Sequence, residues 1–129
     1  MTTDRIAVIQ CLYEAFGSGD MEAVGRLIAN TDWHEAKGMP YGGRYQGSAE
    51  VFENVFSRIA ADVEGFSATP DELLLAGDDR VLALGHYTGK ALNGDLNVAY
   101  AHLWTVHDGE IVKFVQYADT HQFREFLKT

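Results

Sequence analysis

Cationic side chains are scarce in this sequence: ten lysines and arginines stand against nineteen aspartates and glutamates, for a net charge of −9. A surface of that sign repels phosphate backbones and anionic lipids, so we expect neither nucleic acid nor a membrane as a partner. The lone cysteine, Cys11, excludes an internal disulfide. No apolar run approaches the roughly 20 residues that span a bilayer, and the first ten residues do not read as a secretory signal. These absences predict a cytoplasmic protein.

Markers of a second domain, a metal or a cofactor are also missing. The 129 residues match the commonest size of one domain, and no change in composition marks a boundary, so residues 1–129 are interpreted as a single domain. With 47% hydrophobic residues, such a chain can form a core without disulfides or metal. The histidines lack metal-ligand spacing, and no glycine-rich phosphate loop follows a strand. We therefore expect no cofactor.

The first half of the chain has helical periodicity. Apolar residues recur every three or four positions over residues 4–16, again over 20–28 after the capping candidate Asp20, and again over 48–63. Residues 31–36 are short and contain a tryptophan, which favours a strand. The segment 38–47 is rich in glycine and is interpreted as a loop that could form the rim of a pocket.

The second half has the pattern of a sheet. Segments of about ten residues at 64–76, 80–92, 96–107 and 110–118 are separated by turn dipeptides such as Asn-Gly and Asp-Gly, which suit tight hairpins. Residues 120–127 would form a short closing helix. The sequence thus predicts an α+β domain in which three helices cover one face of a curved antiparallel sheet and leave a pocket between them.

The hairpin turns also predict which side chains share a face of the sheet. If the turns centre on residues 93–94 and 108–109, then His86, Ala101 and Gln116 form one cross-strand row. The adjacent rows hold Leu84, Leu103 and Phe114 on one side, and Thr88, Ala99 and Ala118 on the other. Small apolar residues with two polar side chains beside them are typical of a pocket wall.

The opposite face of the same strands is aromatic. It would carry Tyr87, Tyr100, His102, Trp104 and Tyr117. Such a face is too apolar to be left in water. Because the helices cover only one face, we expect a second copy of the chain to cover this one in a two-fold homodimer.

The order of these elements, with AFGSGD at 15–20, TDWHE at 31–35 and VQYADTHQF at 115–123, resembles the nuclear transport factor 2-like superfamily. The chain is most similar to its SnoaL-like and ketosteroid-isomerase-related branch. The resemblance implies a cone-shaped, cystatin-like fold, a homodimer and an apolar small-molecule ligand. Members include isomerases, polyketide cyclases, epoxide hydrolases, dehydratases and non-catalytic binders, so the fold implies no single reaction.

The resemblance also suggests which residues to compare. The three functional groups of the steroid isomerases would fall on Leu12, on Glu35 or Ala36, and on Ala101, so two of the three would be missing. Steroid isomerisation is therefore not expected. The cyclase-like and epoxide-hydrolase-like members end their last strand with an aromatic-x-Asp motif, which Tyr117-Ala118-Asp119 matches. The Arg-x-Asp pair of the epoxide hydrolases is replaced by His86 and Thr88.

Three titratable residues are candidates for catalysis. Asp119 could be a buried acid with a raised pKa, or it could cap the helix that begins at Thr120. His86 could exchange protons or orient a ligand, or be a histidine satisfied by its neighbours. Glu35 shares a face with Trp33 and would be a second pocket carboxylate if that face points inward, or a solvated edge residue if it does not.

Further residues are predicted to line the pocket. They are Tyr13, Phe16, Trp33, Tyr41, Phe52, Phe56, Thr88, Ala101, Phe114 and Gln116. The aromatic members could equally belong to the core. The amide of Gln116 would need a hydrogen-bond partner inside an apolar cavity.

Three functions fit this pattern. The first is a cofactor-independent isomerase, lyase or cyclase that acts on a small, apolar carbonyl or hydroxyl compound. The second is a non-catalytic carrier or sensor of a small hydrophobic ligand. The third is a structural dimerisation module whose core holds no pocket.

Overall fold

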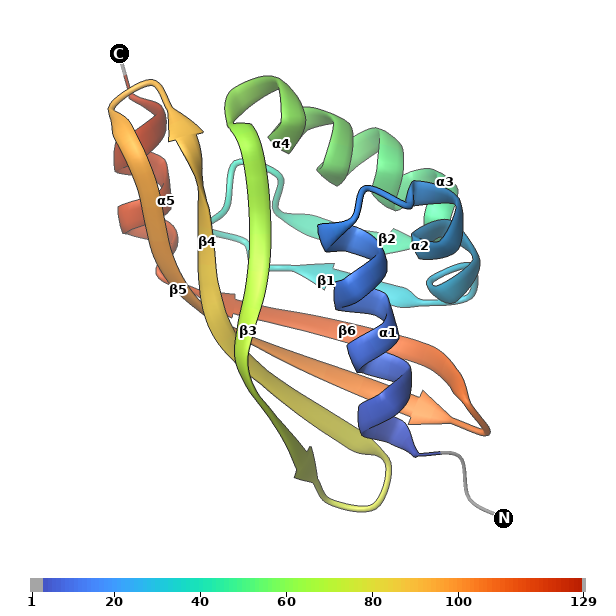
Figure 1. The fold of residues 1–129 in the computed structure, drawn as a ribbon. Coiled ribbons are helices and arrows are strands. Elements are labelled where there is room, and N and C mark those ends of the chain that lie inside the picture. The colour runs from blue at the N-terminus through green and yellow to red at the C-terminus, as the bar shows by residue number, and fades with distance from the viewer. Residues whose placement is uncertain (1–3, 129) are drawn as a thin grey trace.

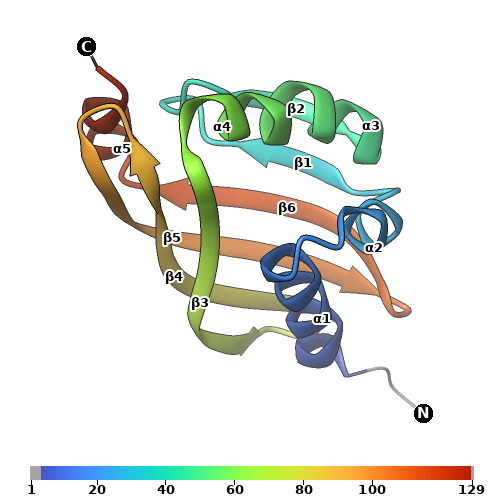
Figure 2. The same cartoon turned by 45° about the horizontal axis from the view of Figure 1, so that its top comes forward.

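The computed structural model describes residues 4–128 as a curved sheet with helices against its concave face (Figure 1). The strands are β1 Asp32–Glu35, β2 Gly43–Gln46, β3 Glu64–Ala76, β4 Arg80–Ala91, β5 Gly94–His107 and β6 Glu110–Ala118, in the spatial order β2-β1-β6-β5-β4-β3. The helices are α1 Arg5–Gly17, α2 Met21–Leu27, α3 Gly47–Val51, η1 Phe52–Phe56, α4 Ser57–Asp62 and α5 Thr120–Leu127. Figure 2 shows α1, α2 and the α3–α4 segment on one side of the sheet, with α5 at one end. The predicted α+β fold is confirmed.

The first two helices begin at aspartate caps. The Asp4 carboxylate accepts a hydrogen bond from the backbone N–H of Ile6, and Asp20 accepts one from Ala23. These bonds satisfy amides that have no partner within the helix. A buried residue of each helix, Ile9 in α1 and Val24 in α2, faces the core. Both helices that the periodicity predicted are therefore present.

The third predicted helix differs in two respects. It begins at Gly47, one residue before the predicted segment 48–63, and the N-cap residue Gln46 makes no side-chain capping bond. Its middle turn, Phe52–Phe56, is a π-helix, a wider turn that is rare and frequent near functional sites. The 48–63 segment is thus continuous but not uniformly α-helical.

The strands of the second half lie within two residues of their predicted bounds. The short β1 pairs antiparallel with β2, which falls in the predicted glycine-rich loop and was not foreseen. β1 also pairs with β6 in parallel, with Trp33 opposite Phe114, so the sheet is antiparallel except at this one junction. The junction brings the end of β1 beside the middle of β6, which positions Glu35.

The register corrects the predicted faces. His86 pairs with Ala99, not Ala101, because the β4–β5 turn consists of Leu92 and Asn93; this two-residue difference leaves the faces unchanged. Between β5 and β6, however, the pairing shifts at Thr105/Val106, and His102 lies opposite Gln116. A one-residue shift exchanges the two faces of a strand relative to its neighbour.

The aromatic face of the sheet is therefore the inner one. Tyr87, Tyr100, His102 and Trp104 are at most 5% exposed and pack within the core of their own chain. The prediction that these four form a dimer interface is wrong, because the chain's own helices cover them. Tyr117, the fifth predicted interface residue, pairs with Ala101 on the opposite, convex face and is 57% exposed.

Candidate functional site

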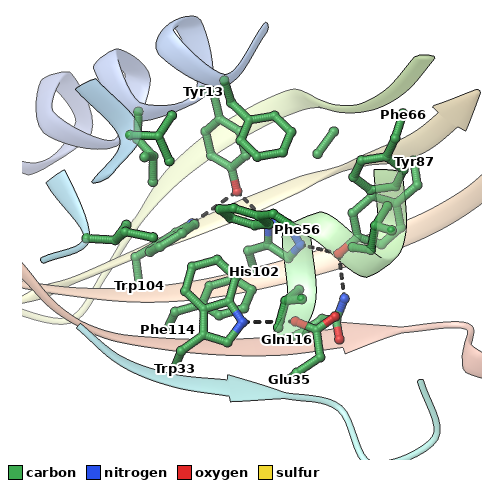
Figure 3. Close-up of a pocket in the computed structure, with 17 residues that line it drawn as sticks. Tyr13, Trp33, Glu35, Phe56, Phe66, Tyr87, His102, Trp104, Phe114 and Gln116 are labelled. Carbon is green, nitrogen blue, oxygen red and sulfur yellow. Dashed lines mark hydrogen bonds between the residues drawn. The ribbon is translucent and has the colours of Figure 1, made fainter. Parts of the chain in front are cut away.

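A cavity lies between the concave face of the sheet and the helices (Figure 3). It measures about 50 Å³ when traced by the centres of water-sized spheres. Its walls are mainly aromatic, with Tyr13, Phe16, Trp33, Phe56, Trp104 and Phe114 among them. Such a volume holds a few water molecules or a compact organic molecule.

Glu35 is the carboxyl group of this cavity. It ends β1 and points inward with Trp33, whose indole Nε1 donates a 2.9 Å hydrogen bond to Glu35 Oε1. The residue is 5% exposed, and its Oε2 is buried without a hydrogen-bond partner. Removal from water raises the pKa of Glu35 to about 7, because the polar side chains of Trp33 and Gln116 beside it offset only part of the desolvation. Glu35 can therefore gain or lose a proton near neutral pH.

His102 lies in the middle of the inner face, between two tyrosine hydroxyls. Its Nδ1 is 2.6 Å from the hydroxyl of Tyr13 on α1, and its Nε2 is 2.5 Å from that of Tyr87 on β4. Burial lowers the pKa of His102 to about 3, so its imidazole is neutral over the physiological range. His102 is thus a hydrogen-bonding group and not a cation.

Both ends of this chain of hydrogen bonds are anchored. The indole Nε1 of Trp104 donates to the Tyr13 oxygen at 3.0 Å, and the amide Nε2 of Gln116 donates to the Tyr87 oxygen at 2.7 Å. Gln116 Oε1 in turn accepts from the backbone N–H of Ala36, next to Glu35, at 2.9 Å. The polar groups of the cavity are therefore held in one orientation.

Two of the three predicted catalytic residues lie outside the cavity. Asp119 is exposed and caps α5, where its carboxylate accepts from the backbone N–H of Gln122 at 3.0 Å. His86 is exposed on the convex face, with its Nδ1 3.1 Å from Asp71 Oδ2. Both predicted placements are wrong, since His86 belongs to the outward set of β4 and Asp119 follows the end of β6. Glu35 alone faces inward.

The structure places six of the ten predicted ligand-binding residues on the cavity wall. They are Tyr13, Phe16, Trp33, Phe56, Phe114 and Gln116. Tyr41 instead packs on Phe123 and donates a hydrogen bond to Asp62. Phe52 lies against Gly25 and does not line the cavity. Thr88 and Ala101 lie on the convex side of the sheet.

Three lining residues, Tyr87, His102 and Trp104, were assigned to the wrong face. The aromatic alternation of Tyr100, His102 and Trp104 along one strand could have identified them, if that face had been interpreted as the inner wall of a pocket and not as a dimer interface. Of the positions compared with the steroid isomerases, Leu12 and Glu35 line the cavity and Ala101 does not, whereas the neighbouring Tyr13 and His102 do.

The cavity adjoins an apolar groove between the end of α1, α4 and the start of β3. Phe16, Phe56, Ile59 and Phe66 line both the cavity and the groove. The rings of Phe16 and Phe56 meet edge to face, with centroids 5.2 Å apart. Phe56 is also the last residue of the π-helical turn. These phenylalanines form the wall between the cavity and the surface.

Within residues 4–128, no three His, Cys, Asp or Glu side chains gather in a way that could hold a metal ion. Over the same range, no helix has the length and apolar character needed to cross a membrane.

The sequence profile of the SnoaL-like domain matches residues 9–114, most of the chain. The chain belongs to the SnoaL-like domain family. No protein of curated function matches it.

Solved structures share this SnoaL-like fold over nearly the whole chain. An NTF2-like protein from Burkholderia thailandensis E264 is 29% identical, with a TM-score of 0.88 over 96% of this chain and 97% of that one. TerC, co-crystallised with polyporic acid, is 26% identical, with a TM-score of 0.85 over 96% and 98%. A candidate SnoaL-like polyketide cyclase from Shewanella putrefaciens CN-32 is 11% identical, with a TM-score of 0.76 over 96% of both chains, a likeness of fold alone.

Proposed function

We propose that this SnoaL-like domain binds a small, largely apolar, uncharged molecule and acts on it as a cofactor-independent isomerase, lyase or cyclase. The observation that carries the proposal is Glu35, a buried carboxyl group with a pKa of about 7 and an oxygen without a partner, on the wall of an aromatic cavity. An acid or base works best when its pKa lies near the working pH. Glu35 therefore takes the role that the sequence assigned to Asp119.

The lining of the cavity supports the choice of ligand. Neither lysine nor arginine is among the described residues that line it, so a phosphate or carboxylate would find no counter-charge. The tyrosine hydroxyls beside His102 could donate a hydrogen bond to an oxygen atom of a ligand, and the aromatic walls could pack against the hydrocarbon part of the same ligand. TerC, co-crystallised with polyporic acid, supports small-molecule binding as a use of this fold. A neutral carbonyl compound satisfies all of these conditions.

The arrangement suggests a proton transfer next to a carbonyl group. In its ionised form, Glu35 would take a proton from the carbon beside the carbonyl, while a wall hydroxyl donates a hydrogen bond to the oxygen on which charge develops. Return of the proton to another position completes an isomerisation. Burial of the site excludes water, which strengthens both interactions.

Thermal-shift screening tests the binding proposal. Small hydrophobic carbonyl compounds should raise the melting temperature, and nucleotides should not. For a compound that is turned over, Glu35→Gln should retain binding and slow the reaction about 100-fold or more, because an amide cannot transfer the proton. Binding without turnover in the wild type would instead indicate a carrier or sensor. Stabilisation by nucleotides alone would contradict the proposed pocket chemistry.

We also propose that a second copy of the chain covers the convex face. One apolar row crosses four strands on that face. Its neighbouring residues are cross-strand partners, in the order Leu74, Leu82, Leu103 and Val115. Tyr117 lies in a neighbouring row and is 57% exposed. An uncovered apolar face of this kind favours pairing with a second copy of itself about a two-fold axis.

Light scattering tests the homodimer. The wild type should have about twice the 14.3 kDa mass of one chain at micromolar concentration. Tyr117→Asp should dissociate it, because an unpaired charge is costly in an apolar interface. Leu92→Asp, which alters an exposed hairpin residue away from that face, is the matched control and should leave the mass unchanged. A wild type that scatters as a monomer would rule out the dimer.

A further inference from the structure

The Tyr13–His102–Tyr87 cluster contains two hydroxyl protons and one imidazole N–H proton, and their placement decides which group can bind a ligand. This inference rests on the proposed function. Burial raises the pKa of both tyrosines, so each keeps its hydroxyl proton. A neutral imidazole carries one N–H, and its other nitrogen only accepts. His102 therefore donates to one tyrosine oxygen and accepts the hydroxyl proton of the other.

The outer partners of the tyrosines do not use the remaining proton. Trp104 and Gln116 are both donors, through an indole N–H and an amide N–H, so each tyrosine oxygen accepts at its outer side. One of the two tyrosines donates to His102, and the other receives a second hydrogen bond from it. The latter tyrosine keeps a hydroxyl proton that the cluster does not take up. The tautomer of His102 decides which tyrosine this is.

The surroundings of the two hydroxyls differ. Tyr87 receives its bond from Gln116, which also holds the backbone of Ala36 next to Glu35. Figure 3 shows the Tyr87 hydroxyl, Gln116 and Glu35 on one side of His102, with Tyr13 and Trp104 on the other. A carboxylate attracts a hydroxyl proton, and Glu35 Oε2 is a buried acceptor without a partner. Beside Tyr13 the corresponding acceptor is the neutral hydroxyl of Tyr100, which is buried without a partner but attracts a proton less strongly than a carboxylate does. The free proton is therefore more stable on Tyr87 than on Tyr13.

We propose that His102 is held as the Nε2–H tautomer, with Tyr13 donating to Nδ1, so that Tyr87 presents the one free hydroxyl proton to the cavity. His102 is a positioning residue in this arrangement, and Tyr87 is the hydrogen-bond donor that a ligand meets. The cavity then offers one unused donor at Tyr87 and one unused acceptor at Glu35. A small neutral compound that carries both a carbonyl oxygen and a transferable proton fits this pair.

Nitrogen-15 NMR of the imidazole tests the tautomer directly. His102 is identified as the histidine whose signals stay constant as the pH falls to about 4, since its pKa is about 3. We expect a protonated Nε2 and an unprotonated Nδ1. Tyr13→Phe should keep this tautomer, whereas Tyr87→Phe should switch it, because Nε2–H loses its acceptor. A protonated Nδ1 in the wild type, with the switch in Tyr13→Phe instead, would overturn the proposal.

Binding of two probes of equal shape provides the second readout. Cyclopentanone has a carbonyl oxygen, and methylenecyclopentane replaces that oxygen with a carbon. Tyr87→Phe should weaken cyclopentanone about fivefold and leave methylenecyclopentane unchanged, whereas Tyr13→Phe should change the affinity for both probes by the same factor. If Tyr13→Phe selectively weakened the binding of cyclopentanone, the free hydroxyl proton would lie on Tyr13 and the proposal would be wrong. If neither probe binds the wild type, small-molecule binding fails, while the NMR result still decides the tautomer.

Discussion

At pH 8, Glu35→Gln should be more stable than the wild type by about 3 kcal/mol, and at pH 4.5 the two proteins should be nearly equal. The pKa of Glu35 is about 7 in the fold and 4.5 in a free side chain. Between these values the unfolded chain has lost the proton that the folded chain keeps, so the free energy of unfolding falls as the pH rises. Above pH 7 the full cost of about 3 kcal/mol is present, because folding then buries a charge.

Urea denaturation at a series of pH values measures this difference. Glutamine is uncharged, and its side-chain oxygen can still accept from Trp33, so the variant keeps the local hydrogen bond. Glu53→Gln, an exposed carboxylate of η1, is the matched control and should follow the wild type at every pH. Parallel curves for the wild type and Glu35→Gln would show that folding does not raise the pKa of Glu35, and would remove the basis for its role as an acid or base near neutral pH.

Gly85→Ala should lower the free energy of unfolding by about 3 kcal/mol, the upper range for overpacking a core. A Cβ atom at this position would lie 2.2 Å from the carbonyl oxygen of Thr69, 2.8 Å from the Cα of Pro70 and 2.6 Å from the hydroxyl of Tyr100. The first two are backbone atoms of β3, which cannot move without opening the β3–β4 pairing. The third atom belongs to the Tyr100 ring, which stacks on the imidazole of His102 with ring centroids 3.9 Å apart, so a displacement of Tyr100 would reach the cavity.

Chemical denaturation of two glycine variants checks this result. Gly17→Ala, at the last residue of α1, is the control, because a Cβ there meets nothing within 4 Å. It should remain within about 1 kcal/mol of the wild type, since alanine favours a helix over glycine. An unchanged midpoint for Gly85→Ala would mean that β3 yields easily at its irregular pairing near Pro70.

The elements of the fold could be predicted because each has a local signal. Hydrophobic periodicity located α1 and α2, and the turn dipeptides located the hairpins of β3 to β6 to within two residues. β2 was missed because it begins at the second of two consecutive glycines and contains a single apolar side chain, that of Tyr45. The π-helical turn was missed because its apolar spacing does not differ from that of an α-helix.

The site was harder to predict, because it depends on register. β6 places an additional residue, Val112, opposite the Thr105–Val106 step of β5, and nothing in the residue types marks this bulge. Without it, Gln116 is assigned to the face of Ala101, and His102 to the outside. Glu35 could be predicted as a pocket residue, since it alternates with Trp33 on one short strand. Asp119 could not be separated from a helix cap, which it proves to be.

The aromatic wall also contains the intrinsic tryptophan fluorophores of the molecule. The sequence contains two tryptophans, Trp33 and Trp104, and both line the cavity with their ring centroids 5.8 Å apart. Both are at most 5% exposed, so the emission of each reports on its surroundings in the cavity and not on bulk water. All of the intrinsic tryptophan fluorescence therefore originates at the candidate site. A molecule that enters the cavity, or a change in the charge of Glu35 beside Trp33, alters that emission without any added label.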